Sequence, residues 1–373
     1  MADAAADERH MAAALALARR GLGETAPNPT VGCVIVKDGV AIGRGRTASG
    51  GRPHAETLAI AEAGAGTLGA TAYVTLEPCA HHGKTPPCAQ ALIRAGIARA
   101  VVALRDPDAR VNGGGIAMLR AAGIEVEEGI GAAEAARINA GFISVRMRGR
   151  PLVTLKLAAT LDGRIATRSG ESQWITGAAA RQAAHALRGS HDAVMVGVGT
   201  ALADDPELTC RIDGFRRAAL IRVVVDSHLR TPLDGRLART IGSAPLFLLH
   251  RDGVDPARRD AFEALGARLF EVAGAEPGID LGAALAVLAR EGVTRLLVEG
   301  GGVLAAALIR ADLIDRIAWF AAPAVIGGDG APAIAGFGLD SLAAAPRFVA
   351  EATRTLGPDC LMTLRRDACS PES

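Results

Sequence analysis

Pro53-His54-Ala55-Glu56 decides how the first third of the chain is interpreted, together with Pro78-Cys79 and Pro87-Cys88 downstream. One histidine and two cysteines can hold a zinc ion while leaving its fourth coordination position open. A glutamate two residues after the histidine can move protons at that open position. These are the requirements of a hydrolytic deaminase that acts on a nitrogen heterocycle.

The expected ligands lie where helices begin or a strand has just ended. Helices are expected over residues 54–63 and 88–95, and a strand is expected over residues 72–76. The positive end of a helix dipole lowers a thiol pKa and favours the thiolate that binds a metal. Glu56 is expected to be the catalytic proton carrier. The predicted zinc ligands are His54, Cys79 and Cys88.

A structural zinc site is the alternative to a catalytic one. Structural sites normally have four protein ligands. His81 or His82 lies between the two cysteines and could supply the fourth. The absence of any zinc is a further alternative.

Composition narrows the class of protein. The 373 residues are enough for two domains, and 50% of them are apolar, although only 3% are aromatic. A net charge of +1 gives no reason to expect a nucleic-acid or membrane-surface partner. No apolar run reaches the ~18 residues of a membrane span. We expect a cytoplasmic protein whose six cysteines are thiols or metal ligands.

Strand-like and helical runs alternate along the whole chain, which predicts α/β sheets with helices on both faces. The basic segment Arg146–Pro151 shows no apolar periodicity and marks a domain boundary. We expect a first domain over residues 1–146, a second over residues 147–368 and a disordered tail over residues 369–373.

The expected elements of the first domain are helices over 1–20, 54–63, 88–95 and 114–122, and strands over 33–39, 72–76, 100–104 and 124–126. Those of the second domain are strands over 152–157, 193–196, 221–225, 246–249, 296–298 and 316–320, and helices over 177–188, 260–265, 281–290 and 302–311.

The zinc motif resembles the cytidine-deaminase-type zinc superfamily. That group usually has Cys-x-x-Cys, whereas Cys79 and Cys88 enclose eight residues. The runs Thr75–Cys88 and Pro27–Val36 closely resemble the pyrimidine deaminase of riboflavin biosynthesis. This resemblance implies a three-layer α/β/α domain of the cytidine-deaminase type.

The same resemblance implies contacts with a phosphorylated pyrimidine. Asn28 would hydrogen-bond the ring, and Lys84 would meet the 5′-phosphate with His81 or His82 close by. The alternatives are a plain turn residue for Asn28 and a solvated loop charge for Lys84. Thr47 departs from the family pattern, which usually has histidine seven residues before the zinc histidine, and a substrate contact there is in doubt.

The second domain carries strand-to-turn motifs at Leu152–Ala166, Asp192–Thr200, Ala203–Thr209 and Leu297–Gly302. Glycines between a strand and a helix allow backbone N–H groups to approach a phosphate, although a tight turn explains them as well. Together these motifs resemble the reductase half of the same riboflavin enzyme over roughly residues 150 to 366. The resemblance implies a fold similar to dihydrofolate reductase.

Roles in the second domain follow from the resemblance. NADPH would contact Ala158, Trp174, Thr200, Asp204, Ser227, Gly301, Gly302, Val303, Leu304, Ala305, Ala306 and Ala307. The substrate would contact Ser172, Arg188, Leu208, Arg211 and Glu299.

Several of these roles have plain structural alternatives. Arg188 and Arg211 suit a phosphate clamp, because guanidinium binds phosphate bidentately, but both could be ordinary surface arginines. Trp174 could belong to the core. Lys156 and Asp162 could bind ribose hydroxyls or hold the site together. The pair Asp204-Asp205 is expected to form a turn and not a metal site.

The expected activity is bifunctional. A zinc-dependent deaminase would act on 2,5-diamino-6-ribosylamino-4(3H)-pyrimidinone 5′-phosphate, and an NADPH-dependent reductase would convert its ribosyl group to ribityl. One Zn²⁺ is expected in the deaminase domain. The partners would be small phosphorylated pyrimidines, without nucleic acid or membrane, in a possible homo-oligomer. The alternatives are a nucleoside or tRNA deaminase with an appended binding domain, or a non-catalytic binding protein.

Overall fold

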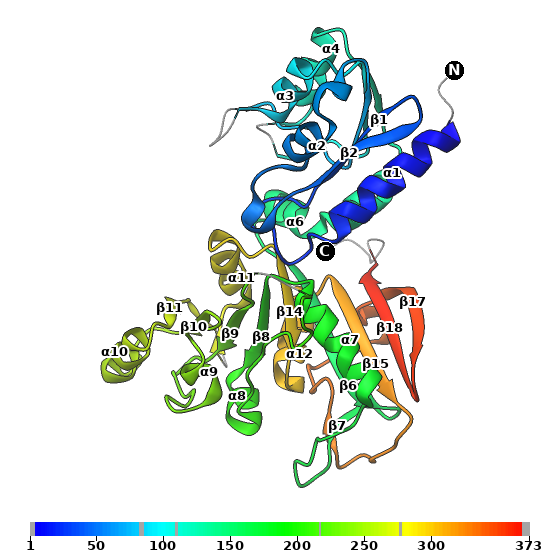
Figure 1. The fold of residues 1–373 in the computed structure, drawn as a ribbon. Helices are drawn as coiled ribbons and strands as arrows, with labels where there is room; N and C mark the ends of the chain where they lie inside the picture. The colour runs from blue at the N-terminus through cyan, green and yellow to red at the C-terminus, as the bar shows by residue number, and fades with distance from the viewer. Residues whose placement is uncertain (1–3, 82–85, 109–110, 216–217, 276–277, 368–373) are drawn as a thin grey trace. The chain divides into compact units, whose positions relative to one another are not determined.

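The computed structural model describes residues 4–81, 86–108, 111–215, 218–275 and 278–367. The chain forms two compact units, Met1–Gly149 and Arg150–Ser373 (Figure 1). The tail expected over residues 369–373 lies outside the described residues. The basic segment at the division is partly helical, because helix α6 (Ala140–Arg148) continues through Arg146.

The first unit is built on a five-stranded sheet in the order β2-β1-β3-β4-β5. Its strands are β1 (Gly32–Lys37), β2 (Val40–Arg46), β3 (Thr71–Val74), β4 (Arg99–Val102) and β5 (Glu125–Glu128). Strand β1 is antiparallel to β2 and β3, whereas β3, β4 and β5 are parallel.

Helices cover both faces of this sheet. They are α1 (Ala4–Arg19), α2 (Ala55–Ala63), α3 (Cys88–Arg94), α4 (Gly114–Ala121) and α5 (Ala132–Ile138). Alternate residues of β1 separate the two cores, since Val34 packs with Met11 of α1, whereas Ile35 packs with Ala59 of α2 and Leu119 of α4. The unit is therefore a three-layer α/β/α domain.

Two glycines of β2 allow α2 to lie directly on the sheet. A Cβ atom at Gly45 would lie 2.1 Å from the carbonyl oxygen of Ala55, and one at Gly43 would lie 2.3 Å from that of Ala59. Only glycine permits this approach of strand and helix. The contact fixes the beginning of α2, where His54 is the N-cap residue.

The second unit contains a nine-stranded sheet in the order β11-β10-β9-β8-β14-β6-β15-β18-β17. Its strands are β6 (Leu152–Thr160), β8 (Ala193–Gly197), β9 (Ile221–Val225), β10 (Leu246–His250), β11 (Arg268–Glu271), β14 (Arg295–Glu299), β15 (Arg316–Ala322), β17 (Phe348–Leu356) and β18 (Asp359–Arg366). The strands from β11 to β15 are parallel, and the hairpin β17–β18 adds to β15 in antiparallel fashion.

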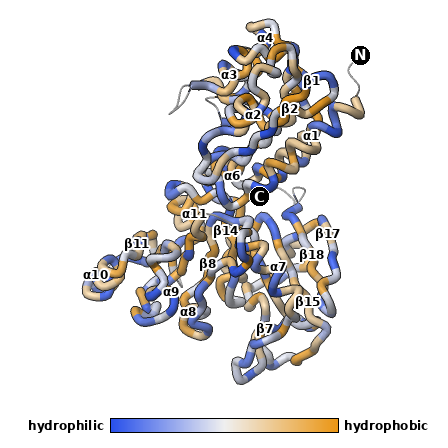
Figure 2. The backbone as a smooth tube through the Cα atoms, viewed as in Figure 1, coloured by the Kyte–Doolittle hydropathy of each residue, from blue (hydrophilic) through white to orange (hydrophobic). Residues whose placement is uncertain are grey.

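Helices cover both faces of this sheet as well. They are α7 (Ala178–Gly189), α8 (Val198–Asp204), α9 (Arg236–Arg239), α10 (Pro256–Ala264), α11 (Leu281–Arg290) and α12 (Gly302–Arg310). In β8, Met195 packs on α11 and α12, whereas Val194 and Val196 pack towards α8, α9 and α10. Apolar residues accordingly run continuously along strands such as β1 and β8 (Figure 2).

Short elements complete both units. Two small ladders join β7 (Arg164–Ala166) to β16 (Ala331–Pro332), and β12 (Gly274–Ala275) to β13 (Gly278–Ile279). Single 3₁₀ turns occur at Ser49–Gly51, Gly64–Thr67 and Leu342–Ala344. Within the described ranges, no helix combines the length and the apolar character needed to cross a membrane.

Candidate functional site

The three predicted metal ligands meet in the first unit. His54 lies at the N-cap of α2, Cys88 is the first residue of α3, and Cys79 lies in the loop after β3. Their ligand atoms all lie within 4.8 Å of one another, and His54 Nδ1 is 3.3 Å from Cys88 Sγ and 3.8 Å from Cys79 Sγ. In the part of the chain that the structure describes, this is the single such cluster of potential metal ligands.

The surroundings of Cys79 favour a thiolate. The Cys88 side chain and the His54 imidazole bond to its sulfur and lower the pKa of Cys79 to about 4. The backbone N–H of Cys88 also donates to Cys79 Sγ over 3.3 Å. The same contact with Cys79, together with burial, raises the pKa of Cys88. The two sulfurs therefore compete to carry one negative charge. A cation bound between them would remove this competition, because it would stabilise both thiolates.

Glu56 lies beside these ligands and is only 3% exposed. Its Oε2 atom is buried and has no hydrogen-bond partner among the described residues. Burial raises the pKa of Glu56 to about 7. A buried carboxyl group with a free oxygen and a raised pKa is suited to accept and return a proton.

Asn28 and Thr47, the two residues before the histidine that bear on pyrimidine binding, have different surroundings. A Cβ atom at Gly51 would lie 1.9 Å from Asn28 Nδ2, so the Asn28 amide lies against the loop that leads to His54. Thr47 is buried, and its hydroxyl accepts from Val31 N over 2.9 Å. The Thr47 hydroxyl therefore has a structural role, since it binds the backbone of Val31.

His81 and Lys84 belong to the loop between the cysteines. His81 is half-buried, and its Nδ1 atom has no hydrogen-bond partner in the described structure. Lys84 and His82 lie outside the described residues. His81 is thus the one described residue of this loop, apart from the cysteines, that carries a ligand-binding side chain.

The second unit has a cavity of about 1000 Å³ at the carboxyl ends of β6, β8, β9 and β14. Ligands of parallel α/β sheets bind at this edge. The predicted residues that line it are Ala158, Ser172, Arg188, Thr200, Asp204, Leu208, Glu299, Gly301, Val303, Leu304 and Ala307.

Other predicted residues lie outside this lining. Trp174 and Arg211 line a second cavity of about 540 Å³ together with His185. Trp174 is 67% exposed and stacks with Arg181, whose guanidinium carbon is 4.6 Å from the ring centroid, so it is not a core residue. Ser227 lies near the rim, since its Oγ is 3.3 Å from the Cβ position of Gly278, which lines the larger cavity.

The glycine turn before α12 is shaped by close contacts. Gly300 has φ of 151°, and Gly301 N donates to Thr200 Oγ1 over 3.2 Å. A Cβ atom at Gly302 would lie 2.5 Å from the Pro332 carbonyl oxygen. Ala305 and Ala306 face the core and are buried.

Charged side chains of the cavity form one buried cluster. Arg188 donates to Glu299 from Nε over 2.5 Å and from Nη2 over 2.9 Å, and its Nη1 donates to the Thr209 carbonyl over 3.0 Å. Lys156 Nζ lies 3.9 Å from Glu299 Oε2. Arg188 is therefore not an ordinary surface arginine, because it is already held by a carboxylate.

This cluster shifts the ionisation of its members. Burial alone would raise the pKa of Glu299, but the charge and hydrogen bonds of Arg188, with the charge of Lys156, lower it to about 2. Burial, together with the charge of Arg188, lowers the pKa of Lys156. The cavity thus holds a carboxylate between two cationic groups.

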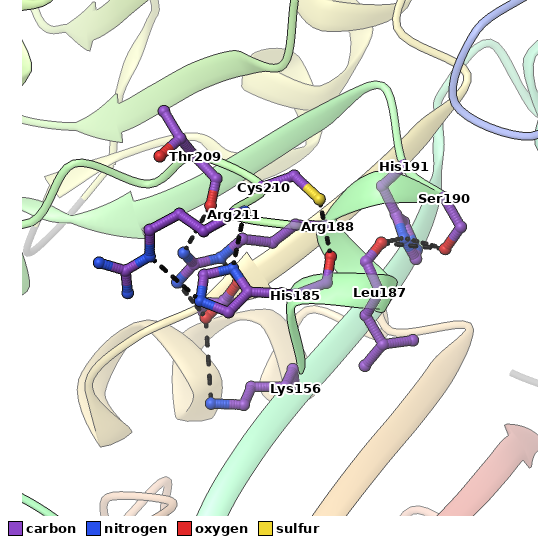
Figure 3. Close-up of polar contacts among 10 residues, drawn as sticks. Lys156, His185, Leu187, Arg188, Ser190, His191, Thr209, Cys210 and Arg211 are labelled. Carbon is purple, nitrogen blue, oxygen red and sulfur yellow. Dashed lines mark hydrogen bonds and ion pairs between the residues drawn. The ribbon is translucent and has the colours of Figure 1, made fainter. Parts of the chain in front are cut away.

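A histidine and a further arginine lie beside this cluster. Figure 3 shows His185 next to Arg188 and Arg211, and Arg211 Nε lies 3.3 Å from His185 Nε2. Burial and the charges of Arg188 and Arg211 lower the pKa of His185. The sequence prediction missed His185, because a histidine on an amphipathic helix carries no distinctive spacing.

Lys156 and Asp162, whose roles the sequence left open, have different surroundings in the structure. Asp162 accepts hydrogen bonds from Thr160 Oγ1 over 2.5 Å and from Gly327 N over 2.7 Å, so it ties two loops together. Lys156 instead faces the cavity. Asp205 has φ of 37° just after α8 and accepts from Arg236 N, as expected for a turn.

Two protein-family models match the chain. Residues 4–104 match the cytidine and deoxycytidylate deaminase zinc-binding region, and residues 151–362 match the RibD C-terminal domain. With the two sites described above, they define the class of protein: a zinc-binding deaminase domain is followed by a reductase domain.

The riboflavin biosynthesis protein RibD of Bacillus amyloliquefaciens is 41% identical over 359 residues, which cover 96% of this chain and 95% of that protein. The chain belongs to the RibD family of riboflavin biosynthesis proteins. It is a bifunctional deaminase and reductase.

Solved structures agree with this assignment. Acinetobacter baumannii RibD, form 1, has a TM-score of 0.88 at 38% identity and covers 98% of this chain and 100% of its own. A second match is the diaminohydroxyphosphoribosylaminopyrimidine deaminase/5-amino-6-(5-phosphoribosylamino)uracil reductase of Thermotoga maritima. It has a TM-score of 0.86 at 33% identity and covers 97% of this chain and 99% of its own. The expected fold class is confirmed: a cytidine-deaminase-like domain precedes a dihydrofolate-reductase-like domain.

Replacing Glu299 by Gln is expected to destabilise the second unit by about 3–5 kcal/mol at pH 7, because Arg188 and Lys156 would remain buried without their carboxylate. The folded-state pKa of Glu299, about 2, lies below its ordinary value of 4.5. The stability that it contributes is therefore fully present above pH of about 4.5 and is lost as the pH falls through about 2.

Urea unfolding of wild type and Glu299→Gln between pH 7 and pH 3 checks this, and the difference between them should shrink with acidity. Glu263→Gln is the matched control, because Glu263 forms an exposed pair with Arg259 worth less than about 1 kcal/mol. A Glu299→Gln loss that stays constant with pH would contradict the buried-carboxylate account.

Proposed function

We propose that the first unit hydrolyses the 2-amino group of 2,5-diamino-6-ribosylamino-4(3H)-pyrimidinone 5′-phosphate. The second unit then reduces the ribosyl side chain of the product, giving 5-amino-6-(5-phosphoribitylamino)uracil. The observation that carries the proposal is the meeting of His54, Cys79 and Cys88 beside the unpartnered Oε2 of buried Glu56. The two activities in the name of the Thermotoga maritima relative support the same pair of reactions.

One Zn²⁺ in the deaminase domain fits these residues. An imidazole nitrogen and two cysteine sulfurs within 4.8 Å of one another make a typical zinc donor set, and three protein ligands leave one position for water. When bound, zinc supplies activation of that water at neutral pH. Glu56 accepts the proton of the attacking water and delivers it to the ring nitrogen. It then takes the proton of the hydroxyl group added to the ring carbon and passes it to the amino group, which leaves as ammonia.

Pyrimidine recognition is assigned to the residues around this site. Asn28 hydrogen-bonds the ring, supported by its amide lying against Gly51 in the loop before His54. His81 and Lys84 meet the 5′-phosphate, supported for His81 by its unpartnered Nδ1. The cation of Lys84 suits a phosphate because charge-assisted bonds are the stronger ones.

The reductase reaction belongs to the larger cavity of the second unit. Ala158, Thr200, Asp204, Ser227 and the beginning of α12, from Gly301 to Leu304 with Ala307, contact the dinucleotide, whose hydride goes to C1 of the sugar in its open-chain imine form. Trp174, which lines the smaller cavity, is also proposed to contact the cofactor. The substrate is contacted by Ser172, Arg188, Leu208, Arg211 and Glu299.

NADPH is proposed over NADH on electrostatic grounds. Arg230 and Arg310 line the larger cavity and are exposed. An arginine near the ribose accommodates the 2′-phosphate that distinguishes NADPH. Asp226, the acidic residue after β9, is buried, and its Oδ2 accepts from Thr231 N and Thr231 Oγ1. It is therefore held away from a ribose hydroxyl.

The partners are proposed to be small molecules and not nucleic acid. A net charge of +1 provides no extended field for a phosphate backbone. A nucleoside or tRNA deaminase would leave the cavity of the second unit, with its Arg188–Glu299–Lys156 cluster, without a role.

Glu56→Gln is expected to keep zinc and to lose ammonia release by at least about 100-fold, because the amide cannot carry the proton. Zinc content and ammonia formation from the diaminopyrimidinone phosphate measure the two properties. Glu62→Gln is the control, since Glu62 is an exposed glutamate on the same helix. Near-normal deamination by Glu56→Gln would rule out this proton carrier.

Arg211→Ala is expected to lower kcat/KM for reduction of the phosphorylated substrate by about 10–100-fold, the loss of one charged hydrogen bond. Arg211 is preferred to Arg188 for this test, because Arg188 also holds Glu299. Ammonia release should be unchanged, as should both activities of the exposed control Arg290→Ala. An equal fall in both activities of Arg211→Ala would refute separate substrate sites.

A further inference from the structure

Glu77 is a buried carboxylate two residues before the metal ligand Cys79, and it is 3% exposed. Its oxygens accept four backbone hydrogen bonds, and all four donors lie at least 29 residues after Glu77 in the sequence. Oε1 accepts from Gly115 N over 2.9 Å and from Ile116 N over 3.2 Å. Oε2 accepts from Gly113 N over 2.9 Å and from Asp106 N over 3.2 Å.

Three of these donors belong to the beginning of α4. The N-cap residue of this helix is Gly113, which has φ of 90° and no side chain to cap the first turn. Exposed N–H groups at a helix start need an acceptor, and a carboxylate is the favoured one. Glu77 supplies it from another element, so the helix and the metal-binding loop are joined directly.

Close backbone packing reinforces the junction. A Cβ atom at Gly115 would lie 1.9 Å from the Pro78 carbonyl oxygen and 3.3 Å from Glu77 Cγ. Glu77 N also donates to Leu104 O over 2.8 Å. The segment from Glu77 to Cys79 therefore packs directly against the beginning of α4. A residue larger than glycine at position 115 would displace this segment.

The other side of Cys79 rests on α3. Its sulfur accepts from Cys88 N over 3.3 Å, and its carbonyl accepts from Ala89 N over 3.3 Å. Cys79 is thus held between two helix starts. Neither Glu77 nor α4 contributes a metal ligand.

We infer that Glu77 is a positioning residue for the metal centre: its carboxylate, bound to the start of α4, holds the Cys79 thiolate at the distance at which it and His54 and Cys88 share one zinc ion. The inference rests on the proposed zinc function. Residues that orient metal ligands typically change metal affinity by about 10–100-fold when they are replaced.

Glu77→Gln tests the role, because an amide group places a donor opposite backbone N–H groups and leaves two of them without an acceptor. Zinc affinity, measured by competition with a chromophoric chelator, should fall by about 10–100-fold. In the cobalt-substituted protein, the thiolate-to-cobalt charge-transfer band should weaken. Neither readout depends on catalysis.

Asp7→Asn is the matched control for stability. Asp7 is equally buried at 3%, belongs to α1 on the opposite face of the sheet, and pairs with Arg99 and Tyr73. It should lower the free energy of unfolding without changing zinc affinity. A Glu77→Gln protein that is destabilised like Asp7→Asn, yet binds zinc within twofold of wild type, would overturn the positioning role.

Gly115→Ala and Gly114→Ala keep the inference testable if Glu77→Gln does not fold. A methyl group at Gly115 meets the Pro78 carbonyl, whereas one at Gly114 makes an ordinary 3.4 Å contact with the Ala80 Cβ atom. Only Gly115→Ala should lose zinc affinity, and equal affinities would contradict the inference. Wild-type protein that binds no zinc would overturn the proposed function itself, and the inference with it.

Discussion

Three ligand atoms must meet within 4.8 Å although they come from His54, Cys79 and Cys88, and the architecture of the first unit serves this convergence. His54 is the N-cap residue of α2 and Cys88 is the first residue of α3, so the N-termini of the two helices meet at the cluster. Gly43 and Gly45 let α2 lie directly on β2. This contact fixes the position of His54, the N-cap residue of α2, relative to the sheet. The described part of the loop that carries Cys79 has no regular structure, and Cys79 is held by the helices beside it.

The second unit contains a buried carboxylate that needs cationic neighbours. Glu299 ends a buried parallel strand and would be unstable there as an isolated charge. Arg188 and Lys156 neutralise it, and the three groups together line the edge of the sheet where a dinucleotide and a phosphorylated sugar can meet. Arg188 and Glu299, which are proposed to contact the substrate, also hold each other in place, so Arg188 cannot be assigned a purely ligand-binding role.

Much of the fold was predictable because its core elements alternate cleanly between apolar strands and amphipathic helices. The bounds expected for β9 and α11 are those observed. Strand β17 was missed because nearly all of it is exposed, so no buried face marks it. The meeting of His54, Cys79 and Cys88 was predictable from residue type and spacing. Glu77 was not, because its partners are backbone N–H groups, and the partner of Arg188 lies 111 residues away.

The central claim is that one chain deaminates a phosphorylated pyrimidine and then reduces the product. The most direct measurement incubates the purified protein with 2,5-diamino-6-ribosylamino-4(3H)-pyrimidinone 5′-phosphate, with and without NADPH, and follows ammonia release and NADPH oxidation separately. The account predicts ammonia in both reactions and NADPH oxidation only after ammonia has appeared, in equal final amounts. NADPH oxidation without ammonia, or no ammonia at all, would contradict it.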